Sequence, residues 1–176
     1  SFCKNINLIS GIGYKKDYLK FVKSSLAKNI KVNFIYKKNS PTIEKKRYLD
    51  KVSNTKVLGV YNLNDNYLDS QQEKLFCKYI NNKIKKADLV IVSDYGHGLI
   101  SKNASKLICN KAKFLSLNTQ INAFNIGYHS LRKYKKIDFL IINEKELMYE
   151  LREKELKIEQ LIKKTINIFN IKNLIL

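Results

Sequence analysis

The chain lacks the features of disulfide-bonded, zinc-binding and membrane-spanning proteins. Its three cysteines lie far apart and form no C-x-x-C pair, which is typical of reduced thiols in a cytoplasmic protein. Its two histidines are isolated, so a zinc site is not expected. No apolar run approaches the roughly 18 to 20 residues of a membrane-spanning helix, and no signal peptide precedes the run "NINLISGIG". We therefore expect a cytoplasmic protein with no membrane partner.

Arginine is scarce although the chain is strongly basic. The formal net charge is +19, yet only three of the 34 basic residues are arginine, namely Arg47, Arg132 and Arg152. Nucleic-acid sites usually concentrate arginine and aromatic residues on one element, whereas the lysines are scattered here. A solvated surface is therefore favoured over a polyanion site, and a nucleic-acid-binding domain is only the third-ranked function.

Strands and helices alternate along most of the sequence. The length of 176 residues suits one domain. Apolar runs predict strands over 6–10, 31–36, 88–93, 113–118, 137–143 and 173–176, and periodic segments predict helices over 17–28, 71–83, 101–111, 144–153 and 157–169. This order is typical of an α/β fold with a doubly wound, mostly parallel sheet flanked by helices. Because the chain starts without Met and stops on a strand pattern, we expect residues 1–176 to form a single partial domain.

One segment departs from this alternation of strand and helix. Residues 42–50 and 56–61 each alternate side chains between two faces, and the turn "VSNT" separates them. Pro41, the only proline, stands just before this segment, where a residue that cannot join a β ladder is tolerated. The pattern predicts a β-hairpin over about 42–61.

Polar and small residues follow the predicted strands, at the edge where ligands of parallel sheets bind. These strand ends are Gly11–Gly13, Asp94–Gly98, Asn118–Gln120 and Asn143–Glu146. Asp94 is the most informative, because an acid at the end of a buried strand is unfavourable unless it is paired or lies in a cleft. Its carboxylate can accept hydrogen bonds from sugar hydroxyls, and Gly96 and Gly98 allow a backbone to approach a ligand closely.

Three of these strand ends allow two interpretations each. "GIGYKKD" is a phosphate-binding loop or, with more weight, a tight structural turn, since it lacks the full dinucleotide and P-loop patterns. Asn143 and Glu146 are a helix cap with a glutamate that the helix dipole favours, or an amide and a carboxylate that hold the water shell of Mg²⁺. His97 is a loop residue or a general base, and the loop residue is favoured.

Several segments resemble one known family in the same order. "SDYGHGLIS", residues 93–101, resembles the S-D-Y-G-K-G segment of the heptose-phosphate kinase branch of the ribokinase-like (PfkB) sugar kinases. "GIGYKKD" is similar to the early G-x-G turn of the family, "PTIEKKRYL" to the T-x-x-K-x-R strand of its lid hairpin, and "IINEKEL" to its N-x-x-E segment. The resemblance covers essentially the whole chain.

The resemblance implies transfer of the γ-phosphoryl group of ATP to a hydroxyl of a sugar or sugar phosphate, with Mg²⁺ as cofactor. It assigns substrate binding to Asp94, Gly96, Gly98 and Arg47, nucleotide and phosphate binding to Asn118 and Asn143, and metal binding to Glu146 and Asn143. The hairpin over 42–61 would be a lid, and we expect it to be the contact of a homodimer.

The sequence also departs from the family. It contains no G-A-G-D, the segment that supplies the anion hole and the catalytic base in the family, so no catalytic residue is assigned and these 176 residues alone are expected to be inactive. His97 replaces the usual lysine, "LNTQ" stands in place of D-P-K-G, and residues 121–137 have no assigned counterpart. A non-catalytic sugar-phosphate-binding module of the same fold is therefore the second interpretation.

Overall fold

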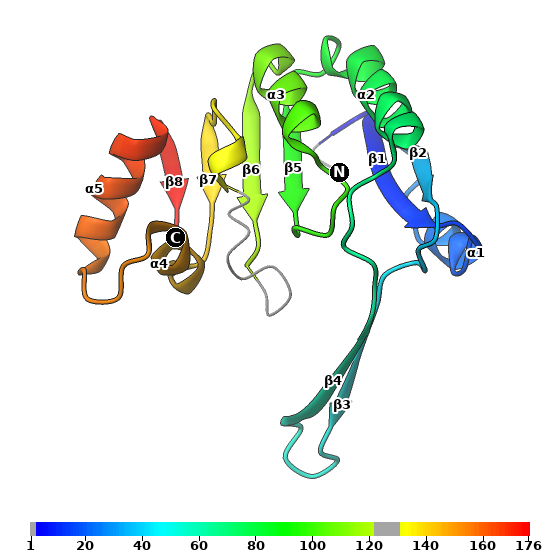
Figure 1. Cartoon of the computed structure of the whole chain (residues 1–176), viewed down its shortest axis with the longest axis horizontal. Helices are drawn as coiled ribbons and strands as arrows, with labels where there is room; N and C mark the ends of the chain where they lie inside the picture. Colours follow the sequence, from blue (N-terminus) through cyan, green and yellow to red (C-terminus); the bar gives the residue numbers. More distant parts are fainter. Residues whose placement is uncertain (1–2, 122–130) are drawn as a thin grey trace.

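The order of the elements confirms the α/β class expected from the sequence. The computed structural model describes residues 3–121 and 131–176. The strands are β1 (Ile6–Gly13), β2 (Ile30–Lys37), β3 (Glu44–Leu49), β4 (Lys56–Asn62), β5 (Val90–Asp94), β6 (Leu115–Thr119), β7 (Phe139–Ile141) and β8 (Asn173–Ile175). The helices are α1 (Leu19–Ser24), α2 (Ser70–Ile84), α3 (Lys102–Lys111), α4 (Glu144–Leu151) and α5 (Ile158–Phe169), with a 3₁₀ turn, η1, at Leu131–Lys133 (Figure 1). Every predicted strand and helix is present, with boundaries that differ by a few residues.

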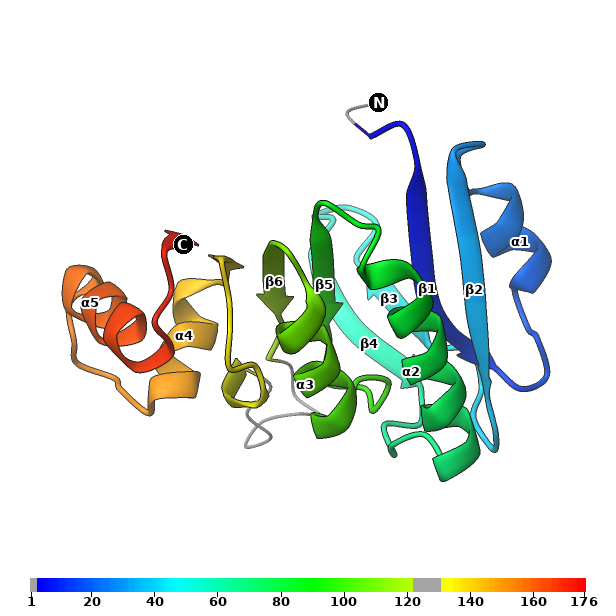
Figure 2. The ribbon, with the colours of Figure 1, turned by 90° about the horizontal axis from the view of Figure 1, so that it is seen from above.

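The parallel strands form two separate hydrogen-bonded groups. β1 pairs with β2, and β5, β6, β7 and β8 form a four-stranded sheet in sequence order. No strand of the described residues joins β1 to β5, so the parallel sheet is divided at this point. Helix α2 contacts both sides of the division, because it packs against β1, β2 and α3 (Figure 2).

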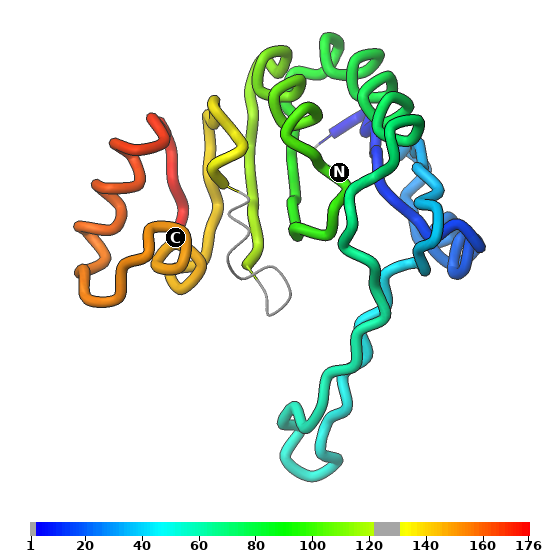
Figure 3. The backbone as a smooth tube through the Cα atoms, in the orientation of Figure 1, coloured from blue at the N-terminus to red at the C-terminus, as the bar shows by residue number. Residues whose placement is uncertain are grey.

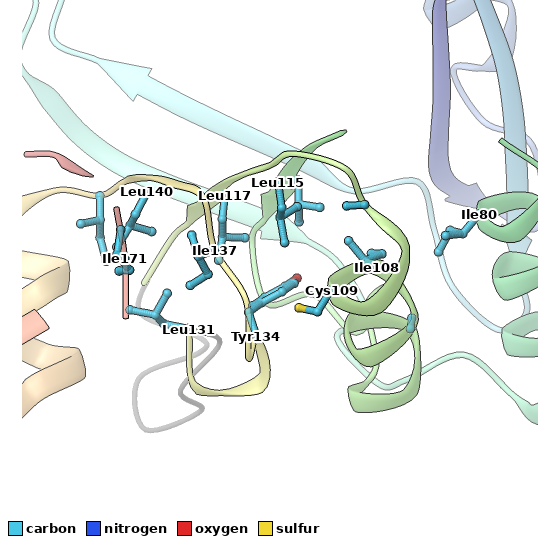
Figure 4. Packing of buried hydrophobic residues seen from close by; sticks show 14 of the residues in the cluster. Ile80, Ile108, Cys109, Leu115, Leu117, Leu131, Tyr134, Ile137, Leu140 and Ile171 are labelled. Carbon is cyan, nitrogen blue, oxygen red and sulfur yellow. The ribbon is translucent and has the colours of Figure 1, made fainter. Parts of the chain in front are cut away.

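The main core lies on one face of the four-stranded sheet. Val92, Leu117 and Leu140 occupy neighbouring register positions on this face and are buried. Figure 4 shows Leu117 and Leu140 among the packed side chains of this core. Successive side chains of a strand point to opposite faces, and the opposite face carries Ile91, which is 70% exposed, and Ile175, which is 53% exposed. The described residues therefore cover this sheet mainly on one face.

The helices are short, and α1 is shorter than the sequence predicts. Tyr18, which precedes α1, has a left-handed backbone (φ 62°) and provides no side-chain cap. The hydroxyls of Ser24 and Ser25 both donate to Phe21 O at 2.9 Å, which competes with continuation of the helix. The longest described helix, α2, has 15 residues, and no described helix combines the length and apolarity needed to cross a membrane.

β3 and β4 form the predicted hairpin, which projects from the rest of the molecule (Figure 3). Its strands are antiparallel, with Lys45 opposite Tyr61 and Arg47 opposite Gly59. Most of its large apolar side chains are exposed, so the hairpin has little core of its own. Contacts at its base must therefore fix its position on the molecule.

Candidate functional site

Two glycines let neighbouring segments approach the base of the hairpin closely. Gly13 N donates to Thr42 Oγ1 at 3.1 Å, and a Cβ on Gly13 would collide with the backbone of Thr42. Gly98, at φ 75°, lies against the backbone of Asn66 in the same way. The structural turn predicted in "GIGYKKD" lies in the later part of this segment, where Lys16 N–H donates to Gly13 O at 2.9 Å; Gly11–Gly13 themselves extend β1 and pair with β2.

Asp94 ends β5 with its carboxylate buried among protein donors. Its side chain is 4% exposed, and Oδ2 lies 2.7 Å from Lys133 Nζ and accepts the Tyr134 hydroxyl at 2.9 Å. Its Oδ1 accepts Gly96 N–H at 3.0 Å. Burial and then the neighbouring carboxylate raise the pKa of Tyr134 well above its usual range, so this hydroxyl remains a donor. The carboxylate thus holds the start of the loop in place, and its contact with a sugar stays a prediction.

Lys37 is a second buried cation at this edge. It ends β2, and its Nζ donates to Asn64 O at 2.6 Å and to His97 O at 3.3 Å. Burial lowers the pKa of Lys37, and the carboxylate of Asp65 opposes that shift. Lys37 therefore ties together the end of β2, the segment after the hairpin and the loop after β5.

The imidazole of His97 has unmet hydrogen-bonding capacity. Its Nδ1 and Nε2 are both shielded from solvent, and neither has a partner among the described residues. Burial and then the ammonium of Lys45 lower the pKa of His97; Lys37 acts in the same direction, whereas Asp65 and Asp94 oppose the shift. The ring is therefore mainly neutral near neutral pH. In this form one ring nitrogen can donate a hydrogen bond and the other can accept one.

Acidification is expected to destabilise the protein through His97. The folded pKa lies below the ordinary value of 6.5, so the unfolded state binds more protons between the two values. The stability that this group contributes above pH 6.5 is lost as the pH falls through the folded pKa. His97→Asn removes this titration, so urea denaturation between about pH 7 and about pH 5 should show a smaller acid loss than in the unsubstituted protein. His129→Asn, which removes the other histidine, is the control, and an unchanged acid loss in His97→Asn would contradict the expectation.

Asn143 and Glu146 form the helix cap that the sequence allowed. Asn143 Oδ1 accepts Lys145 N–H at 2.9 Å, and Glu146 Oε2 accepts Asn143 N–H at 3.1 Å. Glu146 Oε1 also accepts Ile121 N–H at 3.2 Å, so the glutamate joins the segment after β6 to the start of α4. The capping interpretation is present in the structure, and metal binding by the same residues stays a prediction.

The remaining predicted residues lie on different elements. Asn118 is on β6, and its Nδ2 donates to Ile141 O on β7 at 2.9 Å. It therefore lies at the same edge of the sheet as Asn143. Arg47 is exposed on β3, and no ion pair of its guanidinium occurs among the described residues. Its distance from a ligand depends on the position of the hairpin.

The acidic residues of this edge suit an indirect contact with Mg²⁺ better than a direct one. No three His, Cys, Asp or Glu side chains of the described residues come together to hold a metal ion. Each carboxylate oxygen of Glu146 accepts one N–H and keeps a further lone pair. Mg²⁺ usually retains several of its waters, so Glu146 and Asn143 fit a site in which water bridges them to the ion.

Sequence reasoning missed three residues that organise this edge, namely Lys37, Lys133 and Tyr134. In the sequence, nothing separates Lys37 from the other, solvated lysines except its position at the end of a buried strand, which indicates burial. Lys133 and Tyr134 belong to 121–137, which had no assigned counterpart. Of that segment, residues 122–130 lie outside the described residues.

Two curated proteins are similar to the chain in sequence. The chain is 30% identical over 112 residues to the bifunctional protein HldE of Wolinella succinogenes, a match that covers 64% of this chain and 23% of that protein. It is 24% identical over 172 residues to the bifunctional protein HldE of Nitratiruptor sp., a match that covers 92% of this chain and 36% of that protein. The matches thus span well under half of the length of these relatives. No family model matches the chain.

Solved structures agree on the fold. Phosphofructokinase-2 from Escherichia coli, in a complex with potassium, superposes with a TM-score of 0.68 over 96% of this chain and 53% of that chain, at 11% identity. Ribokinase from Giardia lamblia superposes with a TM-score of 0.63 over 96% of this chain and 52% of that chain, at 12% identity. At such identities the likeness to the solved structures shows the fold alone. The evidence of similarity in sequence comes from the two HldE proteins. The chain thus has the fold of the ribokinase-like (PfkB) carbohydrate kinases, is similar in sequence to part of HldE, and spans only part of the length of these proteins.

Proposed function

We propose that the protein carrying this chain is a kinase that transfers the γ-phosphoryl group of ATP to a hydroxyl of a sugar or sugar phosphate. The observation that carries the proposal is the junction between the Asp94–Gly98 loop and the base of the hairpin, at the carboxyl end of β5. Ligands of such sheets bind beyond the carboxyl ends of the strands. The two solved structures that share the fold, phosphofructokinase-2 and ribokinase, carry kinase names that agree with this reaction class.

Phosphoryl transfer requires positioning and neutralisation of charge more than covalent chemistry by the protein. We propose sugar contacts for Asp94, Gly96 and Gly98, an anionic-substrate contact for Arg47, phosphate contacts for Asn118 and Asn143, and a water-mediated Mg²⁺ contact for Glu146 and Asn143. When bound, Mg²⁺ would neutralise charge on the ATP phosphates. The hairpin would act as a lid that excludes water from the transfer.

The hairpin is also our candidate for a contact between two copies. It exposes Val57, Leu58 and Val60, and each of these side chains is at least 46% exposed. An exposed apolar group of this kind marks an interaction surface in many proteins. We therefore propose a cytoplasmic homodimer of a kinase in which residues 1–176 are part of one domain.

The proposal is tested by measuring ADP release with a panel of free and phosphorylated sugars. The full-length protein is expected to release ADP only when ATP and an accepted sugar are both present. The 176-residue chain alone should show no turnover above background, because it contains no G-A-G-D segment. Absence of sugar-dependent ADP release by the full-length protein would contradict the kinase proposal. Sustained turnover by the chain alone would show that the catalytic base lies within it.

A non-catalytic sugar-phosphate-binding module is the second candidate. It is favoured by the engagement of both predicted acids, Asp94 and Glu146, in hydrogen bonds within the protein. A sugar phosphate that raises the thermal midpoint of the full-length protein without any ADP release would support this candidate over the kinase.

A further inference from the structure

The loops at the amino ends of the four-stranded sheet carry a concentration of lysines. They precede β5, β6, β7 and β8, and they are residues 85–89, 112–114, 134–138 and 170–172. These loops contain six lysines, all exposed, namely Lys85, Lys86, Lys113, Lys135, Lys136 and Lys172. The acids of the same loops are Asp88 and Asp138. We call this surface the amino edge, and in Figure 1 it lies along the top, on the side away from the hairpin.

The opposite edge of the same sheet lacks this concentration. The loops after β5, β6 and β7 are described over residues 95–101, 120–121 and 142–143, and these residues include no lysine or arginine. A lysine-rich composition would place lysines at both edges, so composition alone does not account for the difference. Helix dipoles favour cations after α2, α3 and α5, but they do not require Lys135 and Lys136 in the loop between η1 and β7.

Contacts between the loops hold these lysines on one surface. Lys113 Nζ lies 3.2 Å from Asp88 Oδ1, which joins the loops before β6 and β5. Lys136 Nζ donates to Ala112 O at 3.2 Å, which joins the loops before β7 and β6. The loop before β8 lies beside the loop before β7, because these two strands pair. Among the described residues, no ion pair is formed by the other four lysines, Lys85, Lys86, Lys135 and Lys172.

The use of lysine without arginine favours an anionic lipid surface over other partners of negative charge. Nucleic-acid sites usually concentrate arginine and aromatic residues, and protein–protein interfaces are depleted of lysine. Attraction to anionic headgroups needs only positive charge close to the membrane surface, without a particular donor geometry. The six lysines of the amino edge are enough charge for this kind of attraction.

We propose that the amino edge docks the protein on a membrane surface that contains anionic phospholipid. The combined positive charge of the lysines would hold the protein at the headgroups, and this contact needs no membrane-spanning helix. It therefore replaces the expectation of no membrane partner, which rested on the absence of a long apolar run. The candidate site lies at the carboxyl ends of the strands, so docking through the amino ends leaves that site open to solvent. The inference is independent of the proposed kinase function, because no residue of the amino edge belongs to the candidate site.

Sedimentation of the full-length protein with lipid vesicles tests the docking. The protein is expected to bind vesicles of phosphatidylglycerol mixed with phosphatidylcholine but not vesicles of phosphatidylcholine alone, and the bound fraction should fall as salt is raised. The triple variant Lys85→Gln, Lys86→Gln and Lys135→Gln should weaken binding at least about tenfold, because each lysine near the surface contributes to the attraction. These side chains are exposed, so the thermal midpoint of the variant should stay close to that of the unsubstituted protein.

A second triple variant, Lys15→Gln, Lys51→Gln and Lys154→Gln, is the matched control. It removes the same charge from exposed positions after β1, in the hairpin turn and between α4 and α5, and its effect on vesicle binding should stay within about twofold. No measurable vesicle binding, or equal weakening by the two triple variants, would overturn the docking. Duplex DNA is the competing partner. If the protein bound DNA more tightly than vesicles at the same salt, and only the first triple variant lost this binding, the amino edge would be a nucleic-acid surface and the membrane proposal would be wrong.

Discussion

Lys133→Met is expected to lower the free energy of unfolding by about 3–5 kcal/mol, the usual effect of breaking a buried ion pair. The side chains of Lys133 and Asp94 are 10% and 4% exposed, and the two charges lie 2.7 Å apart. Methionine retains most of the apolar stem but leaves the Asp94 carboxylate buried without a counter-charge. The substitution also removes the hydrogen bond from Lys133 Nζ to Ile100 O at 2.7 Å. Urea denaturation of the two proteins measures the difference.

Two further variants show whether burial is the cause. Lys113 pairs with Asp88 at 3.2 Å, but its side chain is 58% exposed, so Lys113→Met should lose no more than about 1 kcal/mol. Asp94→Asn combined with Lys133→Met should lose less than the sum of the two single losses, because the double variant buries no unpaired charge. A loss below about 1 kcal/mol in Lys133→Met alone would mean that the buried pair does not stabilise the fold.

The same variants separate the structural role of Asp94 from its predicted contact with a sugar. If the carboxylate only holds the loop, Asp94→Asn and Lys133→Met should impair sugar use by the full-length protein to a similar degree. If the carboxylate also contacts the sugar, Asp94→Asn should weaken sugar use much more than Lys133→Met does, and much more than it weakens ATP binding. The buried ion pair therefore supplies the control that the sugar-binding prediction needs.

The fold was predictable from the sequence wherever a local pattern determines it. Alternating side chains predicted the hairpin that the structure has at 44–49 and 56–62, and N-x-x-E predicted the cap at Asn143 and Glu146. The partners of Asp94 were not predictable, because Tyr134 lies 40 residues further along the chain and no periodicity connects the two. The division of the sheet between β1 and β5 was not predictable either, because periodicity indicates strands but not which strands pair.

Within the candidate site, the sequence placed Asp94 and Asn143 at or just after the ends of strands, where the structure also has them, but it did not predict the interactions of these residues. Asp94 was singled out as an acid that needs a partner or a cleft, and the structure supplies Lys133 as that partner. His97 was treated mainly as a loop residue, because a histidine between glycines has no local signal for the burial of its ring nitrogens. Burial of single atoms follows from the packing of segments distant in sequence, which no local pattern reveals.

Gly98→Ala is expected to lower the free energy of unfolding by about 2–5 kcal/mol, through backbone strain and overpacking together. Gly98 has φ 75°, a conformation that residues with a Cβ rarely adopt. The added methyl group would also collide with the backbone oxygens of Asp65 and Asn66, which cannot rotate away as a side chain could. Thermal and urea denaturation of the purified variant would measure the loss.

Gly59→Ala is the control for Gly98→Ala, because a Cβ on Gly59 would meet only the side-chain ends of Lys56 and Tyr61, at 3.1–3.2 Å. We expect its loss to stay below about 1 kcal/mol. Gly98→Ala should in addition weaken ligand binding, because the added methyl group would displace the segment after β4. This segment is joined to the loop after β5 through Lys37, whose Nζ donates to both Asn64 O and His97 O. If Gly98→Ala had the stability of the unsubstituted protein, the loop and the base of the hairpin would not be in contact, and the junction that carries the proposed function would be lost.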